Sequence, residues 1–303
     1  MKFINNISDK IWDDFVKKSS QNNIFCKTKY LNTLKVNYEK VGIINNNDEL
    51  ILGNVVFDNN FDFFKVPTLY NGIILSSKIN KPYKVIDTMD YYLDEAIKLY
   101  NRISIRSHYS FEDIRSFSWY NYNKKNKFKI NPYYTGILDL KNINLNKTIN
   151  SGRLQSIKKA VKRGYSSNVE NDIEILDFLN NETFKKQKIV RGEVASFFTK
   201  VISVNSLENS YGRLMVTRNK NSNPVSASLF LYDDGIEYYL AGGTNEEGLE
   251  NGGASLNIYD QIKNSINQNS DLIDFVGINS PNRGYFKTSF GCKPRLFFEL
   301  SYQ

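Results

Sequence analysis

Two ionisable residues near the C-terminus have the types and surroundings that charge stabilisation or proton transfer requires. Lys287 lies beside Phe286 and three residues before Phe290, and an ammonium in such a setting can contact a phosphate or a developing oxyanion. Asp274 lies in an apolar run, where an unpaired carboxylate is costly. Asp274 is therefore either a general base or a residue that holds Lys287 or a backbone turn.

Glu237 and His108 are two further candidates for acid–base chemistry. Glu237 precedes a glycine pair on a predicted strand, where it is either a base or a solvated side chain. His108 is the only histidine, and its ordinary pKa suits proton transfer, although a histidine without a partner is commonly structural. Cys292 has no His or Asn neighbour in the sequence, so we do not expect a cysteine nucleophile.

A glycine-rich loop leads into the helix predicted from Ala254. Backbone N–H groups at a helix start attract phosphate, and glycines let a ligand approach the backbone. The candidate phosphate-binding residues are Gly242, Gly243, Gly252, Gly253 and Ser255. The alternative is a plain connection between strand and helix. A P-loop and a Rossmann glycine fingerprint are both absent from the sequence.

Two other groups of residues can bind anionic or ring-shaped ligands. Arg115 and Trp119 suit the phosphates and rings of a nucleotide sugar, unless Phe117 and Trp119 alternate into the core. A basic helix can attract a diphosphate or an anionic membrane surface, or can be a solvated face. Its cations are Lys158, Lys159, Lys162 and Arg163.

The order of the predicted elements is typical of an α+β chain. Residues 40–57 alternate as a hairpin, and residues 133–140 form a further strand. In the second half, helices are predicted over 153–163, 173–187 and 254–266, and strands over 235–243 and 272–278. We place the domain boundary after residue 147, where an Asn/Leu/Lys-rich stretch precedes the basic helix.

Composition fits a folded protein of two domains. The chain has 303 residues, 41% of them hydrophobic, and a net charge of +8 that permits anionic partners without demanding them. Two cysteines are too few for a secreted disulfide framework. We find no signal peptide and no apolar run near the roughly 18 residues that span a bilayer, so we expect a cytoplasmic protein.

The C-terminal half resembles the FemAB-like branch of the GNAT superfamily of N-acyltransferases. The matching segments are the helix Arg153-Leu-Gln-Ser-Ile-Lys-Lys-Ala-Val-Lys-Arg-Gly, the strand Tyr238-Tyr-Leu-Ala-Gly-Gly-Thr, the helix from Ala254, and Asp274-Phe-Val-Gly with Phe286-Lys-Thr-Ser-Phe-Gly. The last pair is the most specific. Asp113-Ile-Arg-Ser-Phe-Ser-Trp and Tyr133-Tyr-Thr-Gly-Ile-Leu-Asp-Leu match more loosely.

The resemblance implies two tandem GNAT-like domains, each a mixed, mostly antiparallel sheet flanked by helices. Residues 1–147 would be the acceptor side and residues 148–303 the donor side, with Arg153 and Tyr239 among the substrate-binding residues. It implies direct transfer of an acyl group from acyl-CoA, in the first place acetyl-CoA, to an amine of a sugar nucleotide or cell-envelope polysaccharide precursor, without a metal.

Two departures from the family pattern leave alternatives open. The usual pyrophosphate loop of the superfamily is absent, so the acyl-CoA site is inferred from the glycine-rich loop alone. A long charged helical arm, common in aminoacyl-tRNA-dependent members, is also absent. The alternatives are an aminoacyl-tRNA-dependent transferase acting on a peptidoglycan precursor, and a catalytically inactive GNAT-like binding module. The sequence does not fix the oligomeric state.

Overall fold

The chain folds into two compact units. The computed structural model describes residues 1–58, 61–122, 126–186 and 192–302. Unit 1 comprises residues 1–63, 68–134 and 295–303, and unit 2 comprises residues 64–67 and 135–294. The division thus differs from the predicted one after residue 147. Residues 140–150 pack within unit 2, where the Asn150 N–H donates to the Ser289 carbonyl, and the end of the chain returns to unit 1.

Unit 1 is built on two groups of strands, and the pairs whose register is known are antiparallel. The strand orders are β1-β2-β3-β4 and β5-β12-β6, with β6 and β12 each contributing only the part that belongs to this unit. The elements are β1 (Lys2–Ile4), α1 (Asp9–Lys18), η1 (Ile24–Cys26), α2 (Thr28–Leu34), β2 (Tyr38–Ile44), β3 (Leu50–Phe57), β4 (Ile74–Leu75), α3 (Pro82–Leu99), β5 (Ile103–Arg106), α4 (Arg115–Tyr120), β6 (Phe128–Asp139) and β12 (Lys293–Tyr302). The predicted hairpin is therefore β2 and β3.

Apolar residues at helical spacing place α3 and α1 on the strands of unit 1. Met89, Tyr92, Leu93 and Ala96 of α3 are buried in one cluster with side chains of β2, β3, β5 and β12. On α1, Trp12 and Val16 enter a second cluster with residues of β3 and β4. Unit 1 therefore has a core on both sides of its first sheet.

Unit 2 is built on a mixed sheet with the order β6-β11-β10-β9-β8-β7. Its remaining elements are α5 (Leu145–Thr148), α6 (Ser151–Lys162), β7 (Ser166–Glu170), α7 (Ile173–Lys186), α8 (Glu193–Glu208), β8 (Gly212–Arg218), β9 (Pro224–Asp233), β10 (Ile236–Thr244), α9 (Glu246–Glu250), α10 (Gly253–Asn267), β11 (Leu272–Asp274) and α11 (Pro281–Thr288). β10 and β11 are parallel, and the other pairs in this sheet whose register is known are antiparallel. Gln187, the last residue of the predicted 173–187 helix, lies outside the described residues.

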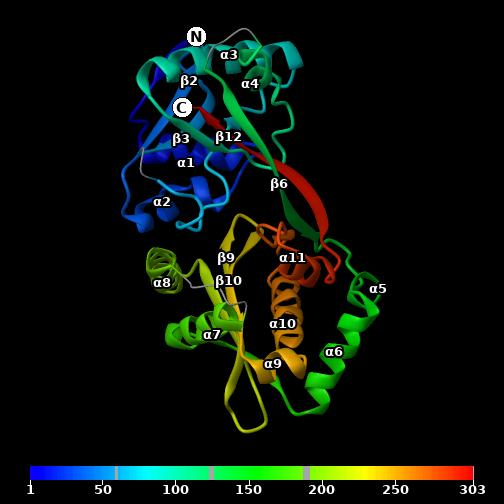
Figure 1. Cartoon of the computed structure of the whole chain (residues 1–303). Coiled ribbons are helices and arrows are strands. Elements are labelled where there is room, and N and C mark those ends of the chain that lie inside the picture. The colour runs from blue at the N-terminus through cyan, green and yellow to red at the C-terminus, as the bar shows by residue number, and fades with distance from the viewer. Residues whose placement is uncertain (59–60, 123–125, 187–191, 303) are drawn as a thin grey trace. The chain divides into compact units, whose positions relative to one another are not determined.

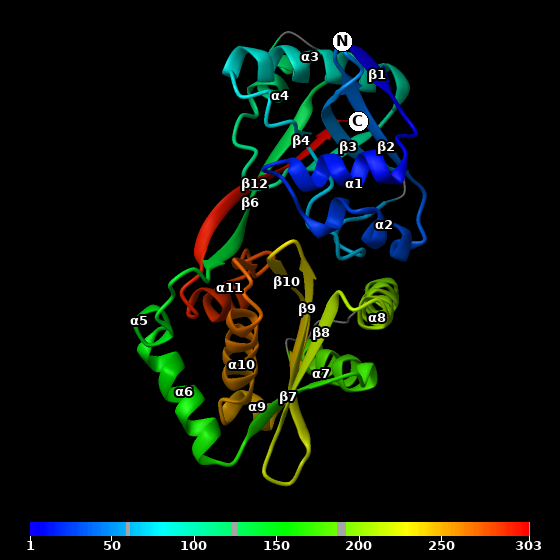
Figure 2. The ribbon, with the colours of Figure 1, turned by 180° about the vertical axis from the view of Figure 1, so that it is seen from behind.

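Helices cover both faces of the sheet in unit 2. Figures 1 and 2 show α7 and α8 on one side of β8, β9 and β10, and α10 on the other side, with α6 on the face of α10 that is turned away from the sheet. α7 approaches β10 so closely that a Cβ on Gly243 would lie 2.2 Å from the Leu179 carbonyl carbon. The core on the α10 side includes Ile157, Leu256, Ile262 and Phe275.

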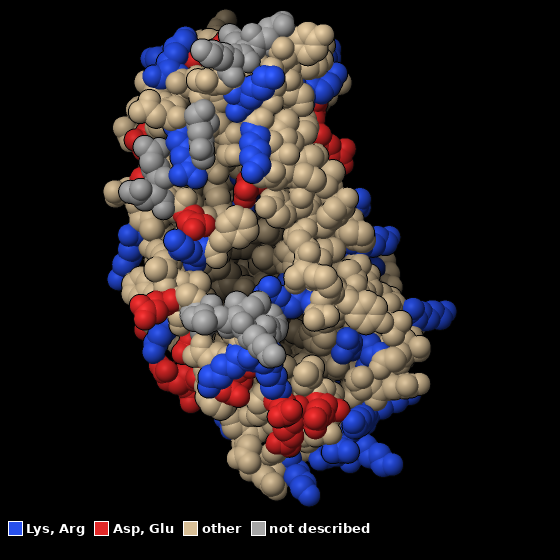
Figure 3. Space-filling view, in the orientation of Figure 1, with Lys and Arg blue, Asp and Glu red and all other residues tan. Residues whose placement is uncertain are grey.

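Charged side chains are spread over the surface. Figure 3 shows lysine and arginine interspersed with aspartate and glutamate on the face that it presents of each unit. Across the described residues, no helix combines the length and the apolarity needed to cross a membrane.

Candidate functional site

The two parallel strands of unit 2 separate after a short common stretch. Ile236, Glu237 and Tyr238 of β10 pair with residues 272–274, but β10 continues to Thr244 whereas β11 ends at Asp274. A register shift between Tyr239 and Ala241 bends β10 at the point of separation. The strand predicted to reach residue 278 is therefore four residues too long.

The side chain of Asp274 ends β11 and starts a turn. Its carboxylate accepts a hydrogen bond from the Val276 N–H at 2.8 Å and a short one from the Thr135 hydroxyl. The φ angles of Val276 and Gly277 are +48° and +37°, a region that β-branched residues rarely adopt. Asp274 is fully buried and holds a backbone turn, which was one of the two roles that the sequence left open.

Lys287 closes the same turn from α11. Its Nζ donates to the carbonyl oxygens of Phe275 at 2.7 Å, Val276 at 2.6 Å and Gly277 at 3.1 Å. An ammonium has three N–H bonds, so these contacts use its full donor capacity. Nζ also lies 4.8 Å from the centre of the Tyr239 ring. These contacts describe a positioning residue, and a direct contact with phosphate or an oxyanion stays a prediction.

The surroundings of Lys287 disfavour the charged form of its amine. Burial and then the nearby Arg283 guanidinium lower the pKa of Lys287 to about 7, while Asp274 and Cys292 act in the opposite direction. Burial raises the pKa of the Tyr239 phenol to about 12 and that of the Cys292 thiol to about 12. A thiol with so high a pKa is a poor nucleophile, in line with the expectation from the sequence.

Arg153 links the starts of α6 and α10 to the end of α11. Its Nε donates to the Ser289 hydroxyl at 2.9 Å and its Nη1 to the Ser255 hydroxyl at 2.8 Å. The guanidinium carbon lies 4.4 Å from the Phe286 ring centre and 5.5 Å from that of Phe290. No carboxylate within the described ranges pairs with Arg153, whose pKa is lowered by burial. A half-buried cation thus stands beside the start of α10 without a compensating charge.

The glycines of the predicted phosphate loop also have packing roles. Gly252 has a φ of +82°, and a Cβ there would lie 2.1 Å from the Ser156 carbonyl oxygen of α6. Gly253 is buried next to Gly248, and the Gly242 carbonyl accepts from the Asn180 side chain of α7 at 2.9 Å. These contacts require small residues at the start of α10 and along β10. Cofactor binding by the same residues stays a prediction.

Glu237 is committed to a buried network at the beginning of β10. Its carboxylate forms a close ion pair with Arg213 of β8 and accepts from Ser270 at 2.7 Å and from Gln261 at 3.3 Å. The Glu237 side chain is fully buried among these partners. A role in proton transfer would require this network to open.

His108 lies in unit 1 among aromatic rings. Its Nδ1 is 2.8 Å from the Ser110 hydroxyl, and its ring centre is 4.7 Å from that of Tyr70 and 4.2 Å from that of Tyr109. Burial lowers the pKa of His108 to about 3, so the imidazole is neutral near pH 7. These contacts are those of a structural histidine, while its catalytic role stays untested.

Arg115 and Trp119 lie on α4 of unit 1. Because the segment is a helix, Phe117 and Trp119 do not alternate into the core: Phe117 is buried and Trp119 is 53% exposed. Arg115 forms a bidentate ion pair with Asp113, and its guanidinium carbon lies 5.5 Å from the Trp119 ring centre. In unit 2, Lys158 and Lys162 are exposed, as expected of a solvated face of α6.

Several residues that shape the site were missing from the sequence analysis. Thr135 of β6 lies far from Asp274 in the sequence, and Ser289 lies far from Arg153. Arg283 of α11 is close to Lys287 in the sequence, but no motif marked it. Val276 gave no sign of its left-handed backbone. The one available signal was the Phe-Lys-Thr-Ser-Phe-Gly motif, which contains Ser289.

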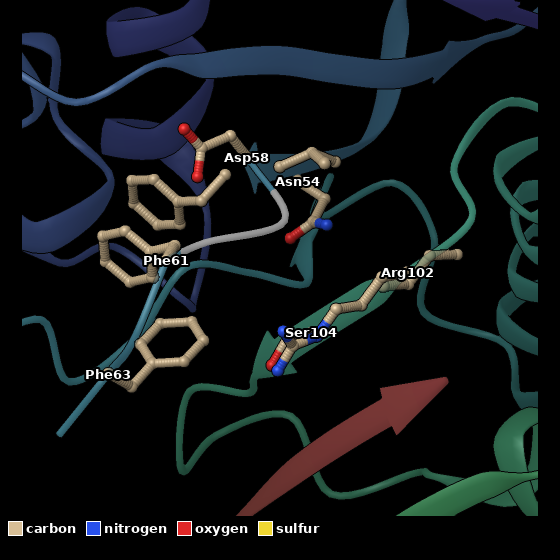
Figure 4. A pocket seen from close by; sticks show the side chains of 9 residues that line it. Asn54, Asp58, Phe61, Phe63, Arg102 and Ser104 are labelled. Carbon is tan, nitrogen blue, oxygen red and sulfur yellow. The ribbon is translucent and has the colours of Figure 1, made fainter. Parts of the chain in front are cut away.

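Two cavities lie away from these residues. One in unit 1, between β3, β5 and the segment after β3, has a volume of about 20 Å³, enough for one water molecule (Figure 4). It is lined by Asn54, Phe57, Phe61, Phe63 and Arg102, among others. A shallow groove of about 540 Å³ in unit 2 lies between α10, β7 and the end of α6. Neither contains a predicted site residue.

Comparison with known proteins relates the whole chain to solved structures. No family model and no curated protein sequence matches it. FemX is similar with a TM-score of 0.69 at 12% identity, over 98% of this chain and 97% of that chain. The C-terminal domain of a putative lysylphosphatidylglycerol synthetase from Agrobacterium fabrum has a TM-score of 0.60 at 10% identity, over 97% and 91%.

A tandem GNAT protein from the clavulanic acid biosynthesis pathway is similar over its whole length. The TM-score is 0.56 at 9% identity, and the match spans 100% of this chain and 98% of that chain. At such low identities the similarity establishes the fold. The chain therefore has the α+β fold of tandem GNAT-like proteins and of FemX, as its motifs predicted.

Proposed function

We propose that this protein is an N-acyltransferase that moves an acyl group from an acyl-CoA thioester to an amine of a sugar nucleotide or cell-envelope polysaccharide precursor. The amine nitrogen bonds to the carbonyl carbon, the carbon–sulfur bond breaks, and the proton lost by the amine balances the released thiol. Direct transfer of this kind needs positioning and charge stabilisation rather than a covalent intermediate.

The observation that carries the proposal is the uncompensated Arg153 beside the start of α10. Its two hydrogen bonds to Ser255 and Ser289 use two of its five N–H groups. The start of a 15-residue helix adds a partial positive charge at the same place. A phosphate group of the donor would supply the missing negative charge, and this supports unit 2 as the donor side.

The separated strands next to Arg153 suit the reacting end of such a donor. β10 leaves β11 at Tyr239, and the turn after Asp274 is fixed by Lys287 from the other side. In the proposal, Lys287 and Asp274 hold this turn in one conformation, so that the strand ends keep their separation. Tyr239 presents its ring beside the Lys287 ammonium and lines the point of separation.

An aminoacyl-tRNA donor is the second candidate. The FemAB-like resemblance of the motifs implies such a donor for some members, and the chain shares its fold with FemX. Aminoacyl-tRNA and acyl-CoA both carry anionic phosphate, so Arg153 would serve either donor. The two candidates differ in size and charge, and RNA binding should weaken steeply with salt.

Calorimetric titration of the purified chain separates the candidates. Acetyl-CoA, a longer acyl-CoA and bulk aminoacyl-tRNA are titrated at low and moderate salt. We expect salt-tolerant binding of an acyl-CoA, weakened about 10- to 100-fold by Arg153→Met because hydrogen bonds to charged groups contribute about 1.5–3 kcal/mol. The methionine keeps the apolar contact with Phe286 and Phe290.

Lys158→Gln, an exposed change on the same helix, is the matched control and should leave donor binding unchanged. Binding of tRNA alone would replace the first candidate with the second. Equal acyl-CoA binding by wild type and Arg153→Met would show that the donor lies elsewhere. Absence of binding by every donor would favour a binding module.

A further inference from the structure

Two large aromatic side chains are exposed in unit 1, one on α4 and one in the turn that follows it. Trp119 is 53% exposed and Tyr122 is 85% exposed, and the Tyr122 N–H donates to the Trp119 carbonyl at 3.0 Å. The inward side of the same turn carries Phe117 and Tyr120, which contact Phe128 at ring-centre distances of 5.1 and 5.5 Å. Trp119 and Tyr122 are therefore the outward members of an aromatic turn.

Two exposed lysines lie at the start of β6, which is hydrogen-bonded to the residue that follows α4. The Asn121 side chain donates to the Phe128 carbonyl at 2.7 Å and accepts from the Phe128 N–H, which fixes the end of α4 against β6. Lys127 directly precedes β6 and Lys129 follows the buried Phe128 within it, and both lysines are exposed. We call Trp119, Tyr122, Lys127 and Lys129 the aromatic–basic surface.

The acidic residue that directly precedes α4 in the chain is already paired. Asp113 is engaged by Arg115 at 2.7 Å. In the part of the chain that the structure describes, neither Lys127 nor Lys129 forms an ion pair. Figure 1 shows where α4 and β6 meet in unit 1.

We propose that the aromatic–basic surface binds an anionic phospholipid bilayer. Tryptophan and tyrosine have an apolar ring and a polar edge, which suits the boundary between headgroups and acyl chains. Lysines beside them gain from the negative surface potential of anionic lipids. The proposal concerns peripheral contact and is independent of the donor site in unit 2.

Unit 2 also exposes two large aromatic side chains. Phe178 and Phe197 are 54% and 58% exposed on α7 and α8, which are tied together by Ser196 and Asp177. Glu174 on the same segment pairs with Lys200. Phenylalanine lacks the polar edge of tryptophan and tyrosine, so Phe178 and Phe197 are a suitable control for exposure alone.

Co-sedimentation with vesicles tests the proposal on the full chain. Vesicles of phosphatidylcholine alone are compared with vesicles containing equal parts of phosphatidylglycerol. We expect binding to the anionic vesicles only, weakened at least about tenfold by the double change Trp119→Ser and Tyr122→Ser, because binding scales with buried apolar area. Lys127→Gln with Lys129→Gln should remove the salt-sensitive part of binding.

Two control variants decide where binding occurs. Phe178→Ser with Phe197→Ser should bind like wild type. A loss of vesicle binding only in the variant Lys158→Gln with Lys162→Gln would assign binding to the basic helix α6 and overturn the proposal. Equal binding to both vesicle types, or no binding to either, would also overturn it. Stacking of a sugar on Trp119 would appear as quenching of tryptophan fluorescence by N-acetylglucosamine without vesicle binding, which also overturns it.

Thermal unfolding and acyl-CoA titration of the same variants make the result interpretable. The four side chains of the aromatic–basic surface are exposed. We therefore expect their variants to keep the melting temperature and the acyl-CoA affinity of wild type. Vesicle binding that persists in a chain without donor affinity would leave this proposal standing and contradict only the proposed function.

Discussion

Each unit contains an arginine stacked on a pair of aromatic rings, but only one of the two is paired with a carboxylate. In unit 1, Arg106 lies 4.6 Å from the Phe63 ring centre and 5.9 Å from that of Tyr133, and it forms an ion pair with Glu299 at 2.7 Å. In unit 2, Arg153 has the same stacked arrangement on Phe286 and Phe290, but its hydrogen-bond partners are two serine hydroxyls.

The difference separates a charge that the fold satisfies from a charge that it leaves available. Both guanidinium groups lose water on burial, and burial is the first cause of the lowered pKa of each. Glu299 compensates Arg106 inside unit 1, so that cation has a structural role. Arg153 lacks such a partner among the described residues, and an anionic ligand is the natural compensation.

The largest effect should follow from breaking the pair in unit 1. Glu299→Gln leaves the Arg106 charge in place at a site where the two side chains are 10% and 14% exposed. Removing one partner of a buried pair typically costs about 3–5 kcal/mol, so we expect that loss in the free energy of unfolding. Denaturant unfolding monitored by circular dichroism measures it.

The matched control is Glu95→Gln, which breaks the exposed pair with Lys98. Stability close to wild type is expected there, because exposed pairs are screened by solvent. If Glu299→Gln is as stable as this control, Arg106 is not compensated by Glu299, and the contrast between the two arginines fails.

The opposite pattern is expected for Arg153→Met. Because the wild-type cation is uncompensated, its removal should leave the melting temperature equal to or above that of wild type, while donor affinity falls about 10- to 100-fold. Thermal unfolding and calorimetry of the same preparation measure both. A clear loss of stability with unchanged donor affinity would make Arg153 a structural residue like Arg106.

The sequence predicted the fold well because local pattern and motif agree. The hairpin of β2 and β3, the helices α6, α7 and α10, and the strand β10 were all expected near their observed positions. These elements have clear apolar periodicity, and the Phe-Lys-Thr-Ser-Phe-Gly motif linked them to GNAT-like proteins. The comparisons confirm that assignment of the fold.

Boundaries and contacts were less predictable, since tertiary interactions decide them. The Asn/Leu/Lys-rich stretch predicted a boundary after residue 147, but packing against the end of α11 places that stretch inside unit 2. β11 stops at Asp274 because the carboxylate caps Val276, which the apolar run 272–278 does not reveal. The partners of Glu237 are Arg213, Gln261 and Ser270, which lie 24 or more residues away in the sequence.

A smaller effect is expected for Lys287. Its contribution to the free energy of unfolding should depend on pH, whereas those of both arginines should not. The pKa of Lys287 is about 7 in the folded chain, below its ordinary value of 10.5. Between these two values the unfolded chain binds more protons than the folded chain, so the free energy of unfolding rises with pH across that window. Arginine stays protonated throughout this window, so Lys287→Arg is the reference variant for the pH dependence.

Denaturant unfolding of both proteins at pH 7 and near pH 10 provides the test. We expect wild type to gain stability relative to Lys287→Arg as the pH rises, because only wild type loses its buried charge. A difference between the two proteins that is constant across this window would mean that Lys287 keeps an ordinary pKa and is solvated by the three carbonyls as fully as by water.

Arg115 extends the comparison to an arginine that is both paired and exposed, where the smallest effect is expected. It has a carboxylate partner in Asp113, as Arg106 has, and an aromatic neighbour in Trp119, as both other arginines have, but its surroundings are water. Because solvent already stabilises the charge, Arg115→Gln should leave the melting temperature and donor affinity at wild-type values. A pronounced loss of acceptor affinity alone would instead assign Arg115 to substrate binding, and burial would then no longer be what distinguishes a functional arginine from a structural one in this fold.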